Sequence, residues 1–447
     1  MSLTTPGAGL RKGRVDWVLF FAALALLAIG TLAVISSVSA LPNQARIVRI
    51  QLTAIPLAML VFGAAWSLNY QVYQDQWKFV YGFLLAILAG VLVFGVVDKG
   101  SRSWYRLPFF SVQPSEFARV GLILVLANFL DKRMGKIKEL RTVLGAFALC
   151  VPVFILMIEQ PDFSGVLLTF PLALIMLFAA GASVFHLSII VGYALISGLF
   201  PILWTIIKLN PELMDNALIS YFFHLSDSWA SALIFVAAVV FGFWLLWRLS
   251  VRLYANLSGI YFAGAAVVLM FGFFSGVLVK RQMKEYQEKR LEVFLSPETD
   301  PRGAGYNLLQ ARIAIGSGGI LGRGIFSGTQ SRLGFVPERH TDFILAVVGE
   351  EMGFWGMLAV TGLYALLMRR LIQGARLARD RFGYLTNCGI FGMFLVYFSI
   401  NFGMLLGLAP VAGVPLPLLS YGGSNLVATM MALGIAQSVY ARRYALV

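Results

Sequence analysis

The stretch WVLFFAALALLAIGTLAVISSVS, residues 17–39, carries no charged side chain and is long enough to cross the hydrocarbon core of a bilayer as a helix. It is also too long for the apolar part of a signal peptide, so we expect it to remain as the first membrane span. The short segment before it is polar and basic, with Arg11, Lys12 and Arg14. The fold therefore begins with a helix that enters a membrane from a positively charged end.

Apolar segments of similar length recur along the whole chain. Of the 447 residues, 59% are hydrophobic and only 13% are charged, whereas soluble domains are roughly 25% charged. The fold class predicted is all-α, a polytopic transmembrane helical bundle with about twelve spans. The predicted spans are 17–39, 50–68, 78–97, 115–131, 142–158, 163–181, 185–207, 230–248, 256–279, 342–368, 386–408 and 426–441.

Basic residues set the predicted orientation. The formal net charge is +14, and Lys and Arg gather in short connections such as 132–141 and 369–385. If the N-terminus is cytoplasmic and the sides alternate, these connections and the tail with Arg442 and Arg443 all fall inside, as the positive-inside rule requires. We therefore expect both termini to be cytoplasmic. Such basic residues attract anionic lipid head groups, so membrane lipids are expected partners and nucleic acid is not.

The cysteines and histidines give no sign of a soft-ligand metal centre. Cys150 and Cys388 lie in separate apolar segments, and the chain has only three histidines. Neither a disulfide framework nor zinc or haem binding is indicated.

One long connection, 280–341, falls on the outer side in this topology and is charged and glycine-rich. Within it Asp300 precedes a proline, and Gly303 and Gly305 follow, a pattern typical of a rigid turn. The carboxylate is therefore expected on a fixed corner of the chain. An isolated Asp-Pro pair is more often only a turn than a catalytic site.

The same connection contains a glycine run, GSGGILGRG at 316–324, and five arginines that follow Asp300. Glycines let a backbone approach an anion closely, and arginine suits phosphate. The run matches neither a Walker loop nor a dinucleotide fingerprint. Tight helix packing and contact with lipid phosphates are the open alternatives. The five arginines are Arg302, Arg312, Arg323, Arg332 and Arg339.

Several ionisable residues lie at or inside predicted spans. Glu116 and Arg119 open the fourth span with a spacing that places them on one helix face, and Asp162 lies between two spans. Glu350 and Glu351 lie about a third of the way into the tenth span. Ionisable groups at such depth usually face an interior cavity. Helix capping and interhelical hydrogen bonding explain them equally well.

Five sequence blocks together resemble the SEDS family, the shape, elongation, division and sporulation proteins. The GTQ and PERHTDF segments are more similar to the rod-shape branch (RodA) than to the division branch (FtsW). The blocks are QPSEFAR (113–119), QPD (160–162), DPRGAGYNLLQARIAIGSGGILGRG (300–324), GTQSRLGFVPERHTDFILAVVGEEMGFWG (328–356) and PLPLLSYGGSN (415–425).

The resemblance implies a peptidoglycan glycosyltransferase that polymerises lipid II, an undecaprenyl-linked disaccharide-pentapeptide, on the outer face of the bacterial inner membrane. It also implies a divalent cation (Mg or Mn) and a class B penicillin-binding protein, a transpeptidase, as partner. Asp300 corresponds to the family's essential acid and is expected to act as the general base, with inversion at the anomeric carbon. The expected substrate-binding residues are Glu116, Arg119, Asp162, Arg302, Gln310, Arg312, Gln330, Glu338, His340 and Ser420.

The chain departs from the family pattern in a few places. Relatives usually have ten spans, so we predict a two-helix insertion at 208–279 within a single transmembrane domain, 1–447, with 280–341 as the extracytoplasmic catalytic loop. Arg119 is a lysine in many relatives, and Asn425 replaces a common serine. None of these changes removes an acid.

Two other functions remain open on sequence alone. A lipid II flippase would also place polar groups inside a helical bundle. A scaffold that only recruits a penicillin-binding protein would tolerate loss of Asp300. An acid on one side of the membrane favours the polymerase, because a flippase needs a path open to both sides.

Overall fold

The computed structural model describes residues 15–98, 101–106, 111–224, 229–253, 257–283, 285–300, 303–330 and 338–444. These residues form two compact units. Unit 1 comprises residues 1–182 and 307–447, and unit 2 comprises residues 183–306.

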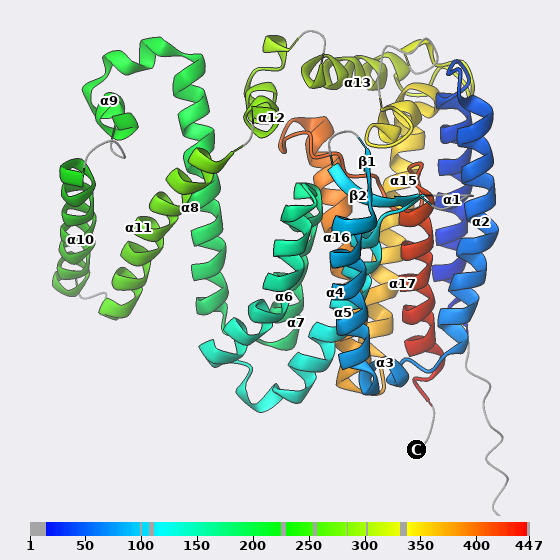
Figure 1. The fold of residues 1–447 in the computed structure, drawn as a ribbon, viewed down its shortest axis with the longest axis horizontal. Helices are drawn as coiled ribbons and strands as arrows, with labels where there is room; N and C mark the ends of the chain where they lie inside the picture. The colour runs from blue at the N-terminus through cyan, green and yellow to red at the C-terminus, as the bar shows by residue number, and fades with distance from the viewer. Residues whose placement is uncertain are drawn as a thin grey trace, which may run out of the picture. The chain divides into compact units, whose positions relative to one another are not determined.

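Unit 1 is a bundle of long helices that come from both ends of the sequence (Figure 1). Its first part holds α1 (Trp17–Ser37), α2 (Gln44–Ser67), α3 (Gln71–Asp75), α4 (Trp77–Phe94), α5 (Pro114–Lys132), η1 (Met134–Lys136), α6 (Leu140–Glu159) and α7 (Phe163–Ala180). Its second part holds α15 (Ile344–Arg376), α16 (Arg381–Leu406) and α17 (Gly423–Ala441).

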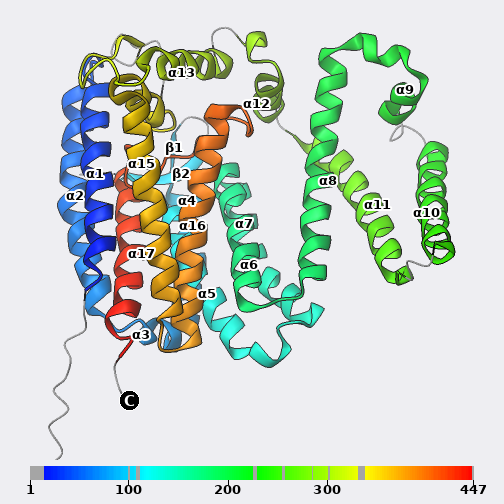
Figure 2. The same ribbon diagram turned by 180° about the vertical axis from the view of Figure 1, so that it is seen from behind.

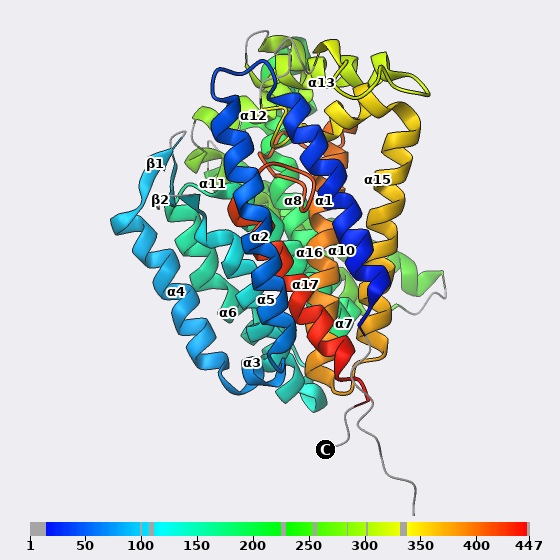
Figure 3. The same ribbon diagram turned by 90° about the vertical axis from the view of Figure 1, so that its right-hand side faces the viewer.

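Helices that are far apart in sequence pack side by side in this bundle. α2 runs along α17, and α1 runs along α15 (Figure 3). α16 packs against α7, α15 and α5 (Figure 2). Gly434 of α17 has no side chain to separate it from α2, and a Cβ there would lie 2.5 Å from the Phe62 carbonyl oxygen. Small residues at such crossings let membrane helices approach closely.

Each of the twelve predicted segments overlaps a helix of the structure, and seven of them extend one to three residues beyond it. Among the described residues, ten helices are long and apolar enough to cross a membrane. α5 and α17 are not among the ten, although both are buried on most sides. α5 carries Glu116, Arg119 and Asp131, and α17 carries many small and polar residues. Their positions were predicted correctly, and the total of twelve spans stays a prediction.

Three short strands between α4 and α5 were not predicted. They are β1 (Val96–Asp98), β2 (Ser101–Arg106) and β3 (Ser111–Val112), and they form one antiparallel sheet in the order β1-β2-β3. Val96 lies opposite Trp104, and Tyr105 lies opposite Val112. Strands this short leave too few alternating residues for a pattern to be read. Ser103 donates to the Gln160 carbonyl at 2.8 Å and so ties the sheet to the turn between α6 and α7.

Unit 2 is built around α8 (Val184–Leu209) and α11 (Gly259–Gln282), which pack along each other. Phe200 and Phe273 meet edge-to-face with ring centroids 4.9 Å apart. The remaining elements are η2 (Pro211–Asp215), α9 (Ala217–Phe223), α10 (Trp229–Arg252), α12 (Glu285–Leu295) and η4 (Pro297–Thr299). The predicted insertion, 208–279, contains α10 and most of α11. That these helices are an insertion stays a prediction.

The predicted long connection, 280–341, contains more helix than its composition suggested. α11 continues to Gln282, and α12 and α13 (Ala304–Gly318) follow. Asp300 lies directly after η4, between these two helices.

Candidate functional site

Glu116 is the centre of a buried polar cluster in unit 1. Its side chain is only 6% exposed, and one oxygen, Oε2, accepts three hydrogen bonds. The donors are Arg119 Nη1 at 2.6 Å, Tyr397 Oη at 2.7 Å and Asn425 Nδ2 at 3.1 Å. They come from α5, α16 and α17, so one carboxylate joins three helices.

The start of α5 explains why a carboxylate is stable at this position. Pro114 occupies the first turn of the helix, and Glu116 lies in the same turn, where the helix dipole favours negative charge. The guanidinium of Arg119 also lies 5.2 Å from the centroid of the Tyr397 ring, within the range of a cation–π contact. Arg119 Nε is buried and has no hydrogen-bond partner among the described residues.

Asp162 caps α7, as the alternative interpretation of this residue expected. Its carboxylate accepts from the backbone N–H of Gly165 at 2.9 Å and from Ser164 Oγ at 3.1 Å. Gln113, the residue before α5, donates to it at 3.3 Å. Asp162 and Glu116 therefore both lie near the start of α5. The ligand-binding role predicted for Asp162 stays a prediction.

Asp300 occupies the predicted corner in unit 2. Its carbonyl oxygen accepts from the backbone N–H of Tyr306 at 3.2 Å, and Oδ1 lies 3.6 Å from Lys289 Nζ of α12. The Asp300 side chain is 12% exposed, whereas that of Lys289 is 62% exposed. A Cβ on Gly303 would overlap the Asp300 carboxylate, so a larger residue here would displace that side chain. The carboxylate is thus held on a tight turn.

Gln330, Glu350 and Glu351 belong to a contact network at the start of α15. The backbone N–H of Gln330 donates to Glu350 Oε1 at 2.7 Å, and Thr329 Oγ1 lies 3.3 Å from the same atom. Ser36 of α1 donates to Glu351 Oε1. These contacts agree with the alternative interpretation of Glu350 and Glu351, in which the two carboxylates form hydrogen bonds to neighbouring elements.

His340 and Ser420 lie where two turns meet. Ser420 Oγ donates to the Thr341 carbonyl at 2.6 Å, and the Tyr421 N–H donates to the His340 carbonyl at 2.8 Å. Burial raises the pKa of the Tyr421 hydroxyl, which stays protonated. Glu338 begins the first turn with a φ of 53° and accepts from Thr341 Oγ1 at 3.2 Å. The structure thus brings these three predicted residues together.

The predicted arginines differ in their surroundings. Arg312 of α13 donates Nε to the Leu405 carbonyl at 3.1 Å, near the end of α16, and Gln310 is half-buried on the same helix. Arg339 is buried and donates to the Ser37 carbonyl at 2.5 Å, at the end of α1. Arg302 and Arg332 lie outside the described residues.

An apolar cavity of about 450 Å³ lies between α4, α5 and α17 in unit 1. Phe79, Phe83 and Leu84 line it from α4, and Phe117 and Leu124 line it from α5. Sequence analysis did not identify this cavity, because apolar residues in a membrane span give no sign of which ones line a space.

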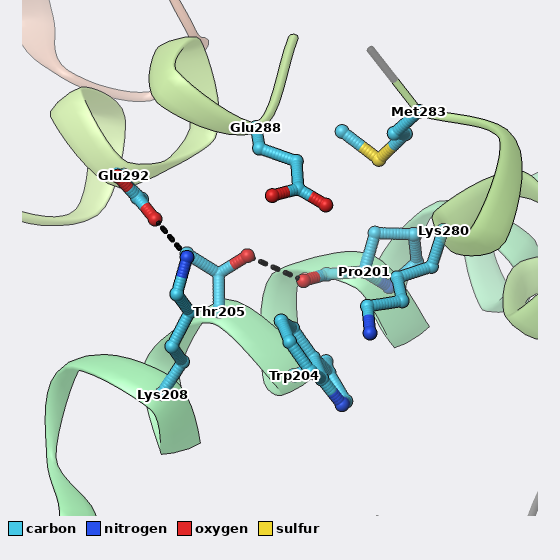
Figure 4. Close-up of a pocket in the computed structure, with 8 residues that line it drawn as sticks. All are labelled: Pro201, Trp204, Thr205, Lys208, Lys280, Met283, Glu288 and Glu292. Atoms are coloured by element: carbon cyan, nitrogen blue, oxygen red, sulfur yellow. Dashed lines mark hydrogen bonds and ion pairs between the residues drawn. The ribbon is translucent and has the colours of Figure 1, made fainter. Parts of the chain in front are cut away.

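A much smaller polar pocket of about 10 Å³, with room for at most one water, lies where α8, α11 and α12 meet in unit 2 (Figure 4). Lys208 Nζ donates to Glu292 Oε1 at 2.7 Å, and Lys280 Nζ lies 3.1 Å from the centroid of the Trp204 ring. The pocket is too small for a substrate. The Lys208–Glu292 contact holds α12, the helix before Asp300, against α8, and the Lys280–Trp204 contact joins α11 to α8.

Sequence analysis missed Tyr397, Asn425 and Lys289 as site residues. The replacement of a common serine by Asn425 was the only signal for any of them. No group of three or more His, Cys, Asp or Glu side chains is arranged to hold a metal ion within the part of the chain that the structure describes.

The sequence blocks and this arrangement agree with comparisons to known proteins. The model of the FtsW, RodA and SpoVE family, described as "Cell cycle protein", matches residues 15–233 and 233–445. The chain belongs to this family. Peptidoglycan glycosyltransferase RodA of Treponema pallidum (strain Nichols) is 31% identical over 443 residues, which cover 96% of this chain and 98% of that protein. Peptidoglycan glycosyltransferase MrdB of Escherichia coli (strain K12) is 32% identical over 373 residues, which cover 83% and 80%.

Solved structures of the family share the fold. A chain of a peptidoglycan synthase complex that coordinates polymerization and crosslinking matches with a TM-score of 0.67 and 27% identity, covering 96% of this chain and 99% of that one. A mutant of the rod-shape-determining protein RodA from Thermus thermophilus matches with a TM-score of 0.59 and 25% identity, covering 96% and 98%. The predicted family and the all-α fold are confirmed, and this is a multi-pass membrane protein.

Proposed function

We propose that this protein is a peptidoglycan glycosyltransferase of the rod-elongation type, which polymerises lipid II at the outer face of a bacterial inner membrane. The observation that carries the proposal is Asp300, a mostly buried carboxylate held on a tight turn in the DPRGAGY block. The relatives named peptidoglycan glycosyltransferases support it. The basic connections favour cytoplasmic termini by the positive-inside rule, and Asp300 then lies outside in the proposed topology.

Asp300 acts as the general base in this mechanism. It accepts the proton of the acceptor sugar hydroxyl while that oxygen forms a bond to the anomeric carbon of the donor sugar. The bond from the anomeric carbon to the pyrophosphate oxygen breaks, and undecaprenyl pyrophosphate leaves with the electron pair. Direct displacement inverts the anomeric carbon.

The buried cluster and the apolar cavity of unit 1 provide groups suited to a lipid pyrophosphate. Arg119 offers a buried N–H to phosphate oxygens, and Glu116 fixes the orientation of its guanidinium. The apolar cavity along α4 and α5 suits a polyprenyl chain. The other candidate substrate-binding residues in this proposal are Gln310, Arg312, Gln330, Glu338, His340 and Ser420.

A divalent cation, Mg or Mn, is part of the proposal. Magnesium at phosphoryl substrates needs only one or two protein carboxylates, with the phosphates as its other ligands. Such an ion needs no cluster of protein carboxylates, so a single carboxylate of this chain would suffice beside the substrate phosphates. Bound there, it would neutralise charge on the pyrophosphate.

The partner in this proposal is a class B penicillin-binding protein, which crosslinks the glycan that this protein makes. The solved synthase complex that coordinates polymerization and crosslinking supports this pairing.

The test is polymerisation of labelled lipid II by the purified protein, with and without a penicillin-binding protein whose transpeptidase is blocked. We expect glycan ladders from the wild type, and a loss of about 10²–10⁴-fold in rate for Asp300→Asn, the range of general-base catalysis. A chelator should also remove the ladders. Ladders of equal intensity from both proteins would exclude Asp300 as the base. No ladders from the folded, partnered wild type would overturn the proposed activity.

A further inference from the structure

The loop after α13, residues 319–326, exposes apolar side chains although its backbone is firmly held. Leu321 is 82% exposed and Ile320 is 67% exposed, and Ile325 and Phe326 are also exposed. A soluble surface rarely gathers so much apolar area in one short segment. We call residues 319–326 the apolar loop.

Four backbone hydrogen bonds fix the apolar loop to α15. Arg323 N–H donates to the Glu350 carbonyl and Gly324 N–H to the Glu351 carbonyl, each at 3.0 Å. In the other direction, Phe354 N–H donates to the Gly319 carbonyl at 2.9 Å and Trp355 N–H to the Ile320 carbonyl at 3.4 Å. Figure 3 shows the loop against the upper end of α15.

Glycine makes this pairing possible. Gly353 has a φ of 64°, a left-handed conformation that breaks the helical geometry of α15 and frees the next two N–H groups for the loop. A Cβ on Gly353 would overlap the Gly322 nitrogen. The glycine run therefore serves close backbone packing, one of the two interpretations that the sequence left open.

The pairing places the loop beside exposed apolar residues of α15. Ile320 is bonded to Trp355, which is 58% exposed, next to exposed Phe354 and with Leu358 less than one turn further. Trp355 lies eleven residues into α15, a helix long and apolar enough to cross a membrane. The apolar loop therefore adjoins exposed apolar side chains inside a candidate membrane span, not at its end.

We propose that the apolar loop is a membrane anchor, which inserts Ile320, Leu321, Ile325 and Phe326 into the lipid beside α15. The four hydrogen bonds to α15 satisfy backbone groups that lipid could not. Arg323, exposed within the loop, would meet lipid phosphates. The anchor holds residues 319–326 in the membrane.

The test measures where a nitroxide label on Leu321→Cys lies, in the full-length protein in nanodiscs of phosphatidylcholine and phosphatidylglycerol. Relaxation by oxygen reports lipid exposure, and relaxation by a water-soluble nickel chelate reports water exposure. Leu358→Cys on α15 is the lipid-facing control, and Asn43→Cys in the exposed turn before α2 is the water-facing control. Cys150 is buried and Cys388 is mostly buried, so labelled wild type gives the background.

We expect the ratio of oxygen to nickel accessibility at Leu321 to exceed that at Asn43 and to approach that at Leu358. A ratio equal to that at Asn43 would place the loop in water and overturn the anchor. Low access to both reagents would mean that protein covers the loop, for example a second copy of the chain, and would overturn it as well. Ile320→Cys repeats the measurement if Leu321→Cys does not fold.

Discussion

Glu116 and Asp300 are both carboxylates in the sequence blocks that resemble the family, yet the molecule holds them in different ways. Glu116 is fixed by side chains from three helices, so its position depends on the whole of unit 1. Asp300 lies on a tight turn, and one of its partners is an exposed lysine on the preceding helix. We therefore expect changes at Glu116 to lower mainly the stability of the protein, and changes around Asp300 to lower mainly its activity.

Glu116→Gln should have the largest effect, and it tests whether the stability of unit 1 depends on the Glu116 carboxylate. The substitution leaves the Arg119 guanidinium buried without its counter-charge, and breaking a buried pair in this way costs about 3–5 kcal/mol. We expect a large fall in the melting temperature, measured in detergent by the unfolding of the purified protein.

The matched control is the double variant Glu116→Gln with Arg119→Met. It removes both charges, so most of the lost stability should return. If the single variant melts like the wild type, water must reach the pair, and the contrast with Asp300 disappears.

Gly303→Ala tests the other half of the comparison. The added Cβ would displace the Asp300 carboxylate, and a shift of about 1 Å at a catalytic group costs roughly 10²-fold in rate. We expect lipid II polymerisation to fall by about that factor with little change in melting temperature.

Gly316→Ala is the matched control for this substitution, because nothing lies within 4 Å of its added Cβ. It should keep near-normal activity. Equal losses for both variants would show that the helix after the turn, rather than the position of Asp300, is what matters.

The contrast also explains how far sequence could predict this site. The i, i+3 spacing predicted that Glu116 and Arg119 share a helix face, and the Asp-Pro-Gly pattern predicted the corner at Asp300, because both are local. Tyr397 and Asn425 lie 281 and 309 residues from Glu116. Their contacts depend on how α16 and α17 are rotated in the bundle, and no local pattern encodes that rotation.

The fold was predictable to a similar degree. Long apolar segments are a strong signal, so every predicted span coincides with a helix. The sheet of β1 to β3 and the polar helix α12 gave no such signal, since their residues are few or hydrophilic. The glycine run was ambiguous, because its role depends on the partner backbone of α15.

Tyr397→Phe tests one of the hydrogen bonds to Glu116, and its expected effect is smaller. It removes one hydrogen bond to a buried carboxylate, worth about 1.5–3 kcal/mol. We expect a moderate fall in the melting temperature. Tyr384→Phe on the same helix is the control, since that hydroxyl donates to a neutral carbonyl at 3.3 Å and its loss should cost less. Equal falls would mean that the charge of Glu116 contributes nothing to the bond.

Lys289→Gln should have the smallest effect, and its size tests whether Asp300 is held by its turn alone. The ion pair spans 3.6 Å, and the lysine is mostly exposed, so water and salt screen it. Exposed pairs of this kind contribute about 0.2–1 kcal/mol, which corresponds to a change in rate of at most several-fold. We expect polymerisation within that range at physiological salt and an unchanged melting temperature. A loss comparable to that of Gly303→Ala would mean that Lys289 positions the carboxylate, and the turn would then be only part of what holds it.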